Sequence, residues 1–128
     1  MKHKNKRVLL VDDEPNILVA IEFLLQQAGY NTEKAFDGIQ ALEKLHSFNP
    51  KLVVLDVMMP GLDGFEVARR IRNTKGFDDL HIIFLTAKGT VMDKMKGYDS
   101  GAEIYLAKPF DNDELVRVVE ELMGVFNG

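Results

Sequence analysis

The chain of 128 residues contains no cysteine. This absence excludes a disulfide framework, thiolate catalysis and any zinc site built on cysteine, and it fits a reducing compartment, so we expect a cytoplasmic protein. Long apolar runs are also missing, because none approaches the roughly 20 residues that cross a membrane as a helix. The basic N-terminal end, residues 1–6, lacks the apolar core of an export signal. We therefore expect no association with a membrane.

A surplus of basic charge is absent as well. The 20 acidic residues outnumber the 16 lysines and arginines, and the formal net charge is −4. This balance argues against a general nucleic-acid surface, so we expect no direct nucleic-acid binding. Residues 12–15 read Asp-Asp-Glu-Pro instead of a glycine-rich phosphate loop, and no Walker sequence is present. Both observations disfavour a flavin or dinucleotide binder.

Apolar runs alternate with helical patterns five times along the chain. The runs predict strands at residues 7–11, 31–35, 52–55, 82–85 and 104–106. The helical patterns carry these apolar residues: Ile17, Ile21, Leu24, Leu25 and Ala28; Ile39, Leu42 and Leu45; Phe65, Ala68 and Ile71; Val91, Met92, Met95 and Tyr98; Leu115, Val118, Val119 and Leu122. Five strand–helix units predict an α/β fold, a single doubly wound parallel sheet with helices on both faces. We place this domain at residues 7–123, with 124–128 as a short C-terminal end.

Carboxylates follow two of the predicted strands. Asp12 and Asp13 come directly after the first strand, and Asp56 ends the third. In doubly wound sheets, ligands bind beyond the carboxyl ends of the strands, where the winding direction reverses, so these three side chains converge if the two strands flank that point. Carboxylates this close need a cation, and Mg²⁺ prefers such oxygen ligands. Helix capping before Pro15, by Asp13 or Glu14, is a second interpretation of these acids that is compatible with metal binding.

The later strand ends supply groups that suit phosphoryl chemistry. A carboxylate beside Mg²⁺ can attack a phosphoryl group and form an aspartyl phosphate. Thr86 offers a hydroxyl donor and Lys108 a compact positive charge. Lys108 precedes Pro109, and an X-Pro bond can be cis at modest cost, so we expect a cis peptide there.

The strand-end residues, in this order, resemble the receiver domain of two-component response regulators, a flavodoxin-like fold of the chemotaxis type: Asp12-Asp13, Asp56, Thr86 and Lys108-Pro109. Residues 56–64, Asp-Val-Met-Met-Pro-Gly-Leu-Asp-Gly, are especially similar to that family. The resemblance covers nearly the whole chain and implies a five-stranded sheet of order 2-1-3-4-5.

The resemblance also implies a phosphorelay. Asp56 would accept a phosphoryl group from a sensor histidine kinase or a histidine phosphotransfer protein. Asp13, Asp56 and the backbone carbonyl of Met58 would bind Mg²⁺, or Mn²⁺, directly, and Asp12 would act through a bound water. The domain would turn over no external metabolite, so apart from its own phosphorylation and dephosphorylation we expect no enzyme activity.

Further residues are implied to read out the phosphoryl group. Thr86 and Lys108 would sense it, and Tyr105, three residues before the lysine, would turn inward as Thr86 moves. This switch would alter the surface of the fourth helix, fifth strand and fifth helix, where an output protein or an effector domain outside this chain would bind. We expect a monomer or a weak, phosphorylation-dependent dimer. Met58 and Lys88, two residues past Asp56 and Thr86, would influence the access of hydrolytic water.

Two other functions compete with the switch. A phosphatase of the haloacid-dehalogenase type places a second acid two residues after its nucleophile, and Met58 at that position speaks against it. A pseudo-receiver would be a binding scaffold that is never phosphorylated, although all five chemical positions are filled here. The sequence also leaves open whether the chain is a complete single-domain regulator or a receiver cut from a longer protein.

Overall fold

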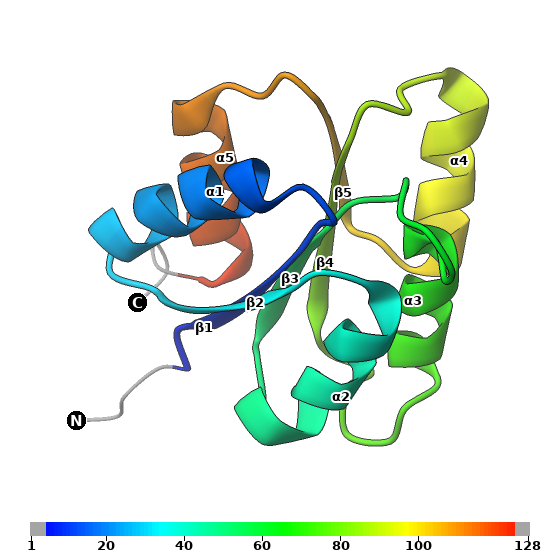
Figure 1. Ribbon diagram of the computed structural model, residues 1–128, viewed down its shortest axis with the longest axis horizontal. Coiled ribbons are helices and arrows are strands. Elements are labelled where there is room, and N and C mark those ends of the chain that lie inside the picture. The colour runs from blue at the N-terminus through cyan, green and yellow to red at the C-terminus, as the bar shows by residue number, and fades with distance from the viewer. Residues whose placement is uncertain (1–4, 125–128) are drawn as a thin grey trace.

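The computed structural model describes residues 5–124, which form five strands and five helices in strict alternation (Figure 1). The elements are β1 Arg7–Val11, α1 Pro15–Gln27, β2 Asn31–Ala35, α2 Gly38–Phe48, β3 Leu52–Leu55, α3 Gly64–Arg72, β4 His81–Thr86, α4 Val91–Ser100, β5 Ile104–Ala107 and α5 Asn112–Leu122. The predicted α/β fold is therefore confirmed. Most of the terminal segments 1–6 and 124–128 lie outside the described residues.

The sheet is parallel throughout and has the order β2-β1-β3-β4-β5, which confirms the order that the resemblance implied. From β1 the chain crosses to β2 on one side and then returns to β3 on the other. The winding direction therefore reverses between β1 and β3. Their carboxyl ends lie side by side, because Val11 pairs with Leu55 in the register.

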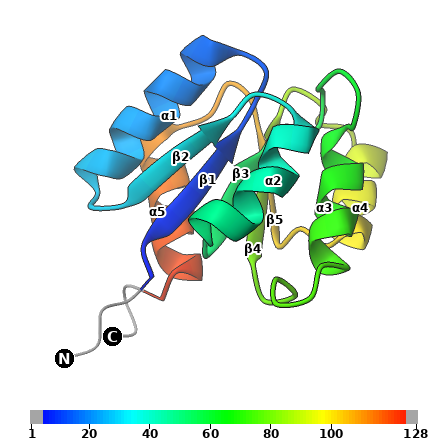
Figure 2. The same cartoon turned by 60° about the horizontal axis from the view of Figure 1, so that its bottom comes forward.

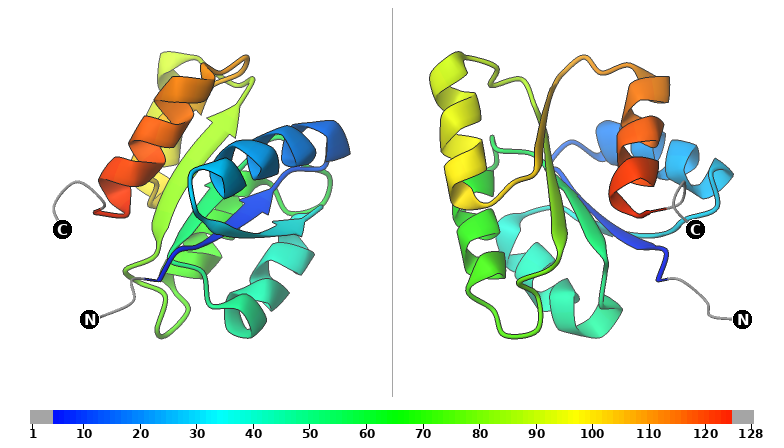
Figure 3. Two further views of the ribbon diagram at one scale, coloured as in Figure 1. Left: turned by 90° about the vertical axis from the view of Figure 1, so that its left-hand side faces the viewer. Right: turned by 180° about the vertical axis from the view of Figure 1, so that it is seen from behind.

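Helices cover both faces of the sheet (Figures 1 and 2). Figure 3 shows α1 and α5 together on one face and the other three helices on the opposite face. Each face buries its own apolar cluster, one built around Phe65 and Phe84 and the other around Leu18 and Leu115. The strands β1, β3 and β4 are buried on both faces, which explains their continuous apolar runs.

Two helical faces differ from the sequence prediction. Ile39 was expected to pack in the second helix, but its side chain is 55% exposed and the helix buries Gly38, Ala41 and Leu45 instead. In α4, Met92 is 81% exposed, and Met95 and Tyr98 are also exposed. The reason is that α4 contacts the sheet through its small residues, Gly97 and Ser100, which the apolar pattern did not count.

Capping at α1 also differs from one interpretation of the sequence. Glu14 occupies the N-cap position without a side-chain hydrogen bond, so the acids before Pro15 do not cap this helix through their side chains. None of the helices within residues 5–124 is long and apolar enough to span a membrane.

Candidate functional site

Three carboxylates meet at the carboxyl edge of the sheet, where β1 and β3 end. Asp12, Asp13 and Asp56 each place a carboxylate oxygen within 4.8 Å of the others. The adjacent strands bring them together, since the backbone N–H of Asp56 donates to the carbonyl oxygen of Val11 at 3.0 Å. Asp12 and Asp56 are buried, whereas Asp13 is exposed. The site is therefore a half-enclosed acidic cluster with one side open to solvent.

Backbone amides orient the two buried acids. One oxygen of Asp12, Oδ1, accepts the N–H of Glu14 at 2.9 Å. In the same way, Oδ1 of Asp56 accepts the N–H of Met58 at 3.1 Å. Each carboxylate thus has one oxygen fixed by its own loop, and its Oδ2 atom turns toward the centre of the site.

Lys108 occupies that centre. Its Nζ atom lies 2.7 Å from Oδ2 of Asp12 and 3.2 Å from Oδ2 of Asp56, while Glu14 lies farther away at 3.7 Å. The lysine follows β5, and its backbone N–H donates to the carbonyl oxygen of Thr86 at 2.9 Å. The Lys108–Pro109 bond is cis, the isomer that we expected at this position. One ammonium group therefore faces both buried carboxylates.

The pKa values of this pair shift because of burial and mutual contact. Burial raises the pKa of the Asp12 carboxyl and outweighs the hydrogen bonds from Lys108 and from the Glu14 N–H, which lower it. Burial alone would lower the pKa of the Lys108 ammonium, but the hydrogen bond to Asp12 and the charge of Asp56 together raise it. The lysine is held firmly in its charged form, whereas the ionised form of Asp12 is disfavoured.

The acidic cluster fits a divalent cation with oxygen ligands. One ammonium offsets only part of the charge of three carboxylates, and carboxylate oxygens are hard donors of the kind that Mg²⁺ and Mn²⁺ prefer. The exposed carboxylate of Asp13 leaves that side of the cluster open to an ion and its waters.

Thr86 and Tyr105 lie beside this cluster on neighbouring strands. Thr86 is fully buried, and its Oγ1 accepts the N–H of Lys88 at 3.2 Å, so its own hydroxyl proton remains available to donate. Tyr105 is 6% exposed, and its hydroxyl donates to the carbonyl oxygen of Lys88. Burial, followed by the charges of Asp93 and Asp56, raises the pKa of Tyr105 to about 12. Both side chains are thus tied to the backbone of Lys88, in the loop between β4 and α4.

Gly64, which the sequence analysis did not single out as a site residue, holds the start of α3 against the segment that follows β3. Its N–H donates to the carbonyl oxygen of Val57 at 2.9 Å. A Cβ atom on this glycine would lie 2.3 Å from the backbone oxygen of Asp56 and 2.8 Å from Cα of Val57. Such distances require backbone movement, so only glycine fits here. The signal in the sequence was Asp63, whose side chain caps α3 through the N–H of Glu66.

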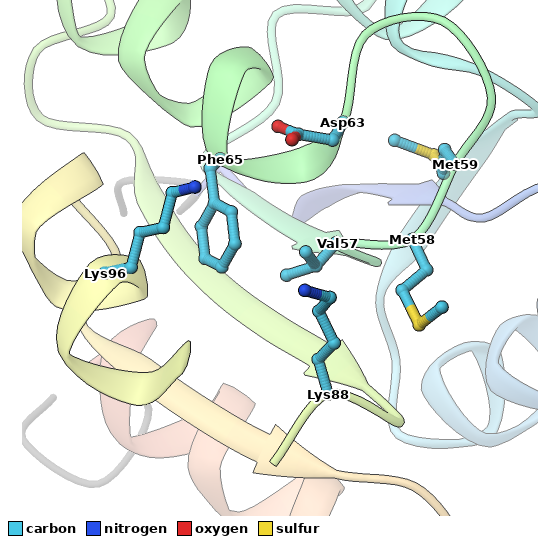
Figure 4. A pocket seen from close by; sticks show the side chains of 7 residues that line it. All are labelled: Val57, Met58, Met59, Asp63, Phe65, Lys88 and Lys96. Carbon is cyan, nitrogen blue, oxygen red and sulfur yellow. The ribbon is translucent and has the colours of Figure 1, made fainter. Parts of the chain in front are cut away.

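A cavity of about 340 Å³ adjoins the cluster without containing any of its three acids (Figure 4). It begins at Val57 and Met58, the residues that follow Asp56, and extends toward α4. Its lining residues are Val57, Met58, Met59, Asp63, Phe65, Lys88 and Lys96. Lys88 does not pair with the acidic cluster, since its Nζ lies 3.6 Å from Asp93. The acidic cluster therefore lies at the border of this hollow.

Comparison with known proteins shows what the chain is similar to. Residues 8–120 match the model of the response regulator receiver domain. The DNA-binding dual master transcriptional regulator RpaA of Synechocystis sp. is 40% identical over 117 residues, which are 91% of this chain and 48% of that protein. The chain thus spans about half the length of the curated relatives that it matches.

Solved structures agree in shape. The crystal structure of a putative response regulator from Chloroflexus aurantiacus superposes with a TM-score of 0.89 at 36% identity, covering 94% of this chain and 99% of that one. The receiver domain of sensor histidine kinase PA1611 from Pseudomonas aeruginosa has a TM-score of 0.86 at 33% identity, covering 94% and 98%. That structure is described as having a magnesium ion coordinated in its active site cleft.

Proposed function

The chain belongs to the family of response regulator receiver domains, and from this membership we propose that Asp56 is the side chain that accepts the phosphoryl group. Receiver domains are signalling domains of two-component systems that interact with histidine kinases and output domains. The observation that carries the proposal is the contact of one lysine with both buried acids, at 2.7 Å to Asp12 and 3.2 Å to Asp56.

In the proposed reaction an oxygen of Asp56 attacks the phosphorus of a phosphohistidine on a kinase or a phosphotransfer protein. A P–O bond forms, the P–N bond breaks, and the donor imidazole keeps the electron pair and takes up a proton. A bound Mg²⁺ or Mn²⁺ ion supplies neutralisation of the charge on the transferred group. Asp13, Asp56 and the backbone carbonyl of Met58 would hold this ion directly, and Asp12 would do so through water.

Lys108 and Thr86 would respond to the new charge. The Lys108 ammonium, already placed at Oδ2 of Asp56, would pair with a phosphoryl oxygen. The buried hydroxyl of Thr86 would donate to another oxygen, and the movement of the side chain toward the phosphoryl group would break the hydrogen bond that its Oγ1 accepts from the N–H of Lys88. Tyr105 is fixed to the same residue through the carbonyl group, so movement of this loop would change the surface formed by α4, β5 and α5.

The partners follow from this chemistry. We propose a sensor histidine kinase or histidine phosphotransfer protein as donor, a cytoplasmic location, and an output protein or effector domain as the receiver of the signal. We expect a monomer or a weak dimer upon phosphorylation, and residues 7–123 as the functional unit. Our expectation of no nucleic-acid binding concerns this unit alone, whereas the Synechocystis relative named as DNA-binding is about twice as long.

Phosphorylation by a small donor tests the proposal. The chain is incubated with acetyl phosphate and Mg²⁺, and the mass of the intact protein is measured. We expect one phosphoryl adduct in the native chain and in Asp99→Asn, a control that removes an exposed carboxylate of α4, and no adduct in Asp56→Asn. An adduct that persists in Asp56→Asn would refute the assignment of the acceptor.

The same assay separates the competing functions. Rapid hydrolysis of many phosphomonoesters without an accumulating adduct would support a phosphatase. Complete lack of both an adduct and Mg²⁺ affinity would support a scaffold that is never phosphorylated.

A further inference from the structure

The ring of Tyr105 lies inward, in a narrow space between β5 and α4. Tyr105 is 6% exposed, and its hydroxyl donates a hydrogen bond to the carbonyl oxygen of Lys88. On one side the ring packs against Phe84 of β4, at 5.8 Å between ring centroids. The inward position therefore depends on the room that α4 leaves above the ring.

Gly97 of α4 provides that room. This glycine is buried, and a Cβ atom on it would lie 2.7 Å from Cδ2 and 2.9 Å from Cε2 of Tyr105. The same atom would lie 3.1 Å from Cδ2 of Phe84. Real Cβ atoms essentially never approach a neighbour below 3.0 Å, so a side chain here would displace something. The question is which of the neighbouring groups can yield.

Phe84 cannot yield, because it is fully buried and its opposite side is filled. Phe65 of α3 packs edge-on against it at 5.4 Å between ring centroids. The carboxyl end of α4 is also held. The Arg72 guanidinium donates to the carbonyl oxygen of Gly101 at 3.1 Å and 2.6 Å, and it donates to the carbonyl oxygens of Asp78 and Leu80 as well.

Tyr105 can yield, since rotation about its Cα–Cβ bond moves the ring toward solvent at the edge strand. The hydrogen bond to Lys88, the packing against Phe84 and the burial of the ring in its apolar cluster oppose this rotation, but no backbone has to move for it. We propose that Gly97 is a positioning residue that permits the inward ring of Tyr105, and that any side chain at residue 97 shifts Tyr105 outward.

The alternative is ordinary close packing, in which a side chain at residue 97 lifts α4 and leaves Tyr105 in place. Arg72 opposes that outcome at one end of the helix. The consequence for signalling rests on the proposed function, because it requires Tyr105 to report phosphorylation. The steric relation between Gly97 and Tyr105 does not depend on it.

Three tyrosines make the proposal testable by NMR with selectively labelled tyrosine rings. Tyr105 reports its own rotation, Tyr98 reports displacement of α4, and Tyr30 is a distant reference on the other face of the sheet. In Gly97→Ala we expect the ratio of inward to outward Tyr105 to fall about tenfold, with the signals of Tyr98 and Tyr30 unchanged. Gly89→Ala is the matched control, because a Cβ there meets nothing within 4 Å.

Each outcome decides the proposal. A shifted Tyr98 signal with an unchanged Tyr105 signal means that the helix moves instead of the ring, which overturns it. Should Gly97→Ala fail to fold, the double variant that carries both Gly97→Ala and Tyr105→Ala is examined by thermal unfolding. A folded double variant identifies the ring as the obstacle and supports the proposal, whereas an unfolded double variant shows that α4 accepts no side chain at residue 97 and refutes it.

Beryllofluoride separates this proposal from the proposed function. In the presence of this acyl-phosphate mimic and Mg²⁺, we expect a smaller inward fraction of Tyr105 in Gly97→Ala than in Gly89→Ala, while acetyl phosphate still gives an adduct in both. Failure to form an adduct would count against Asp56 as acceptor, but the Tyr105 signals in the untreated protein would still answer the question about Gly97. Equal inward fractions of Tyr105 in both variants after this treatment would overturn the regulatory part.

Discussion

Mg²⁺ should reverse the effect of Asp12→Asn on stability. Burial raises the pKa of Asp12, so the folded protein binds this proton more tightly than the unfolded chain does. The ionised carboxylate therefore opposes folding, and its cost appears as the pH rises from the ordinary value of 3.8 through the raised pKa. At neutral pH without divalent ions, we expect Asp12→Asn to be more stable than the native chain.

The size of these changes in stability follows from the geometry of the acidic cluster. The carboxylate oxygens of the cluster lie within 4.8 Å of one another, and at that limit two carboxylates repel each other by about 3.5 kcal/mol at an effective dielectric constant near 20. Lys108 attracts each buried acid and offsets much of this repulsion. The burial of Asp12 therefore decides whether its ionised carboxylate stabilises or destabilises the folded protein. Mg²⁺ at about 100 times its dissociation constant adds about 2.7 kcal/mol to the native chain, or an increase in Tm of about 10 °C. Asp12→Asn, with one ligand charge fewer, should gain less than half of that.

Urea unfolding with EDTA and with MgCl₂, at matched ionic strength, measures both effects. Asp99→Asn serves as the control, because this carboxylate is exposed on α4 and belongs to no part of the acidic cluster. Its curves should follow those of the native chain under both conditions. A variant Asp12→Asn that is less stable than the native chain in EDTA and gains equally from Mg²⁺ would refute the reasoning.

Three further perturbations test other parts of the site. Lys108→Met leaves two buried carboxylates without their cation, so the free energy of unfolding should fall by about 3 kcal/mol in EDTA and recover partly with Mg²⁺. The exposed control Lys94→Met should show no such loss, and an equal loss in both variants would contradict the prediction. Gly64→Ala should slow phosphorylation by acetyl phosphate at least about tenfold, because its Cβ would displace the backbone of Asp56. Gly89→Ala should keep the native rate, and equal rates in the two variants would argue that Gly64 does not position Asp56. In an alkaline titration followed by phenolate absorbance, Tyr105→Phe should remove a step near pH 12, and an unchanged titration curve would exclude a raised pKa of Tyr105. In the native chain, the stability that depends on the neutral phenol should be lost as the pH rises from 10 to about 12.

The acidic cluster was accessible to sequence reasoning for a simple reason. In a parallel sheet all carboxyl ends lie at one edge, so acids after the first and third strands share that edge whatever the details of packing. The apolar runs of these strands are nearly continuous, which is typical of strands buried on both faces. Strand order itself came from the resemblance, since alternation alone is compatible with several orders.

The roles of individual helical residues were less accessible. Met92 and Ile39 have the spacing of core residues but are exposed, because smaller residues of their helices, Gly97 in α4 and Gly38 and Ala41 in α2, are buried in their place. Periodicity ranks residues by hydrophobicity, whereas close approach of a helix to a sheet selects for the absence of a side chain. Gly97 and Gly64 were missed for this reason.

The sequence by itself determined the α/β class, the strand boundaries to within a residue, and which strand ends carry the acidic cluster, because these depend on local periodicity and on the order of residues along the chain. Only the tertiary structure decided that Lys108 bonds Asp12 across 96 positions, that Tyr105 lies inward and that Gly97 makes room for it. Such relations depend on distances between atoms of different elements, and those distances are set by packing and not by spacing in the chain.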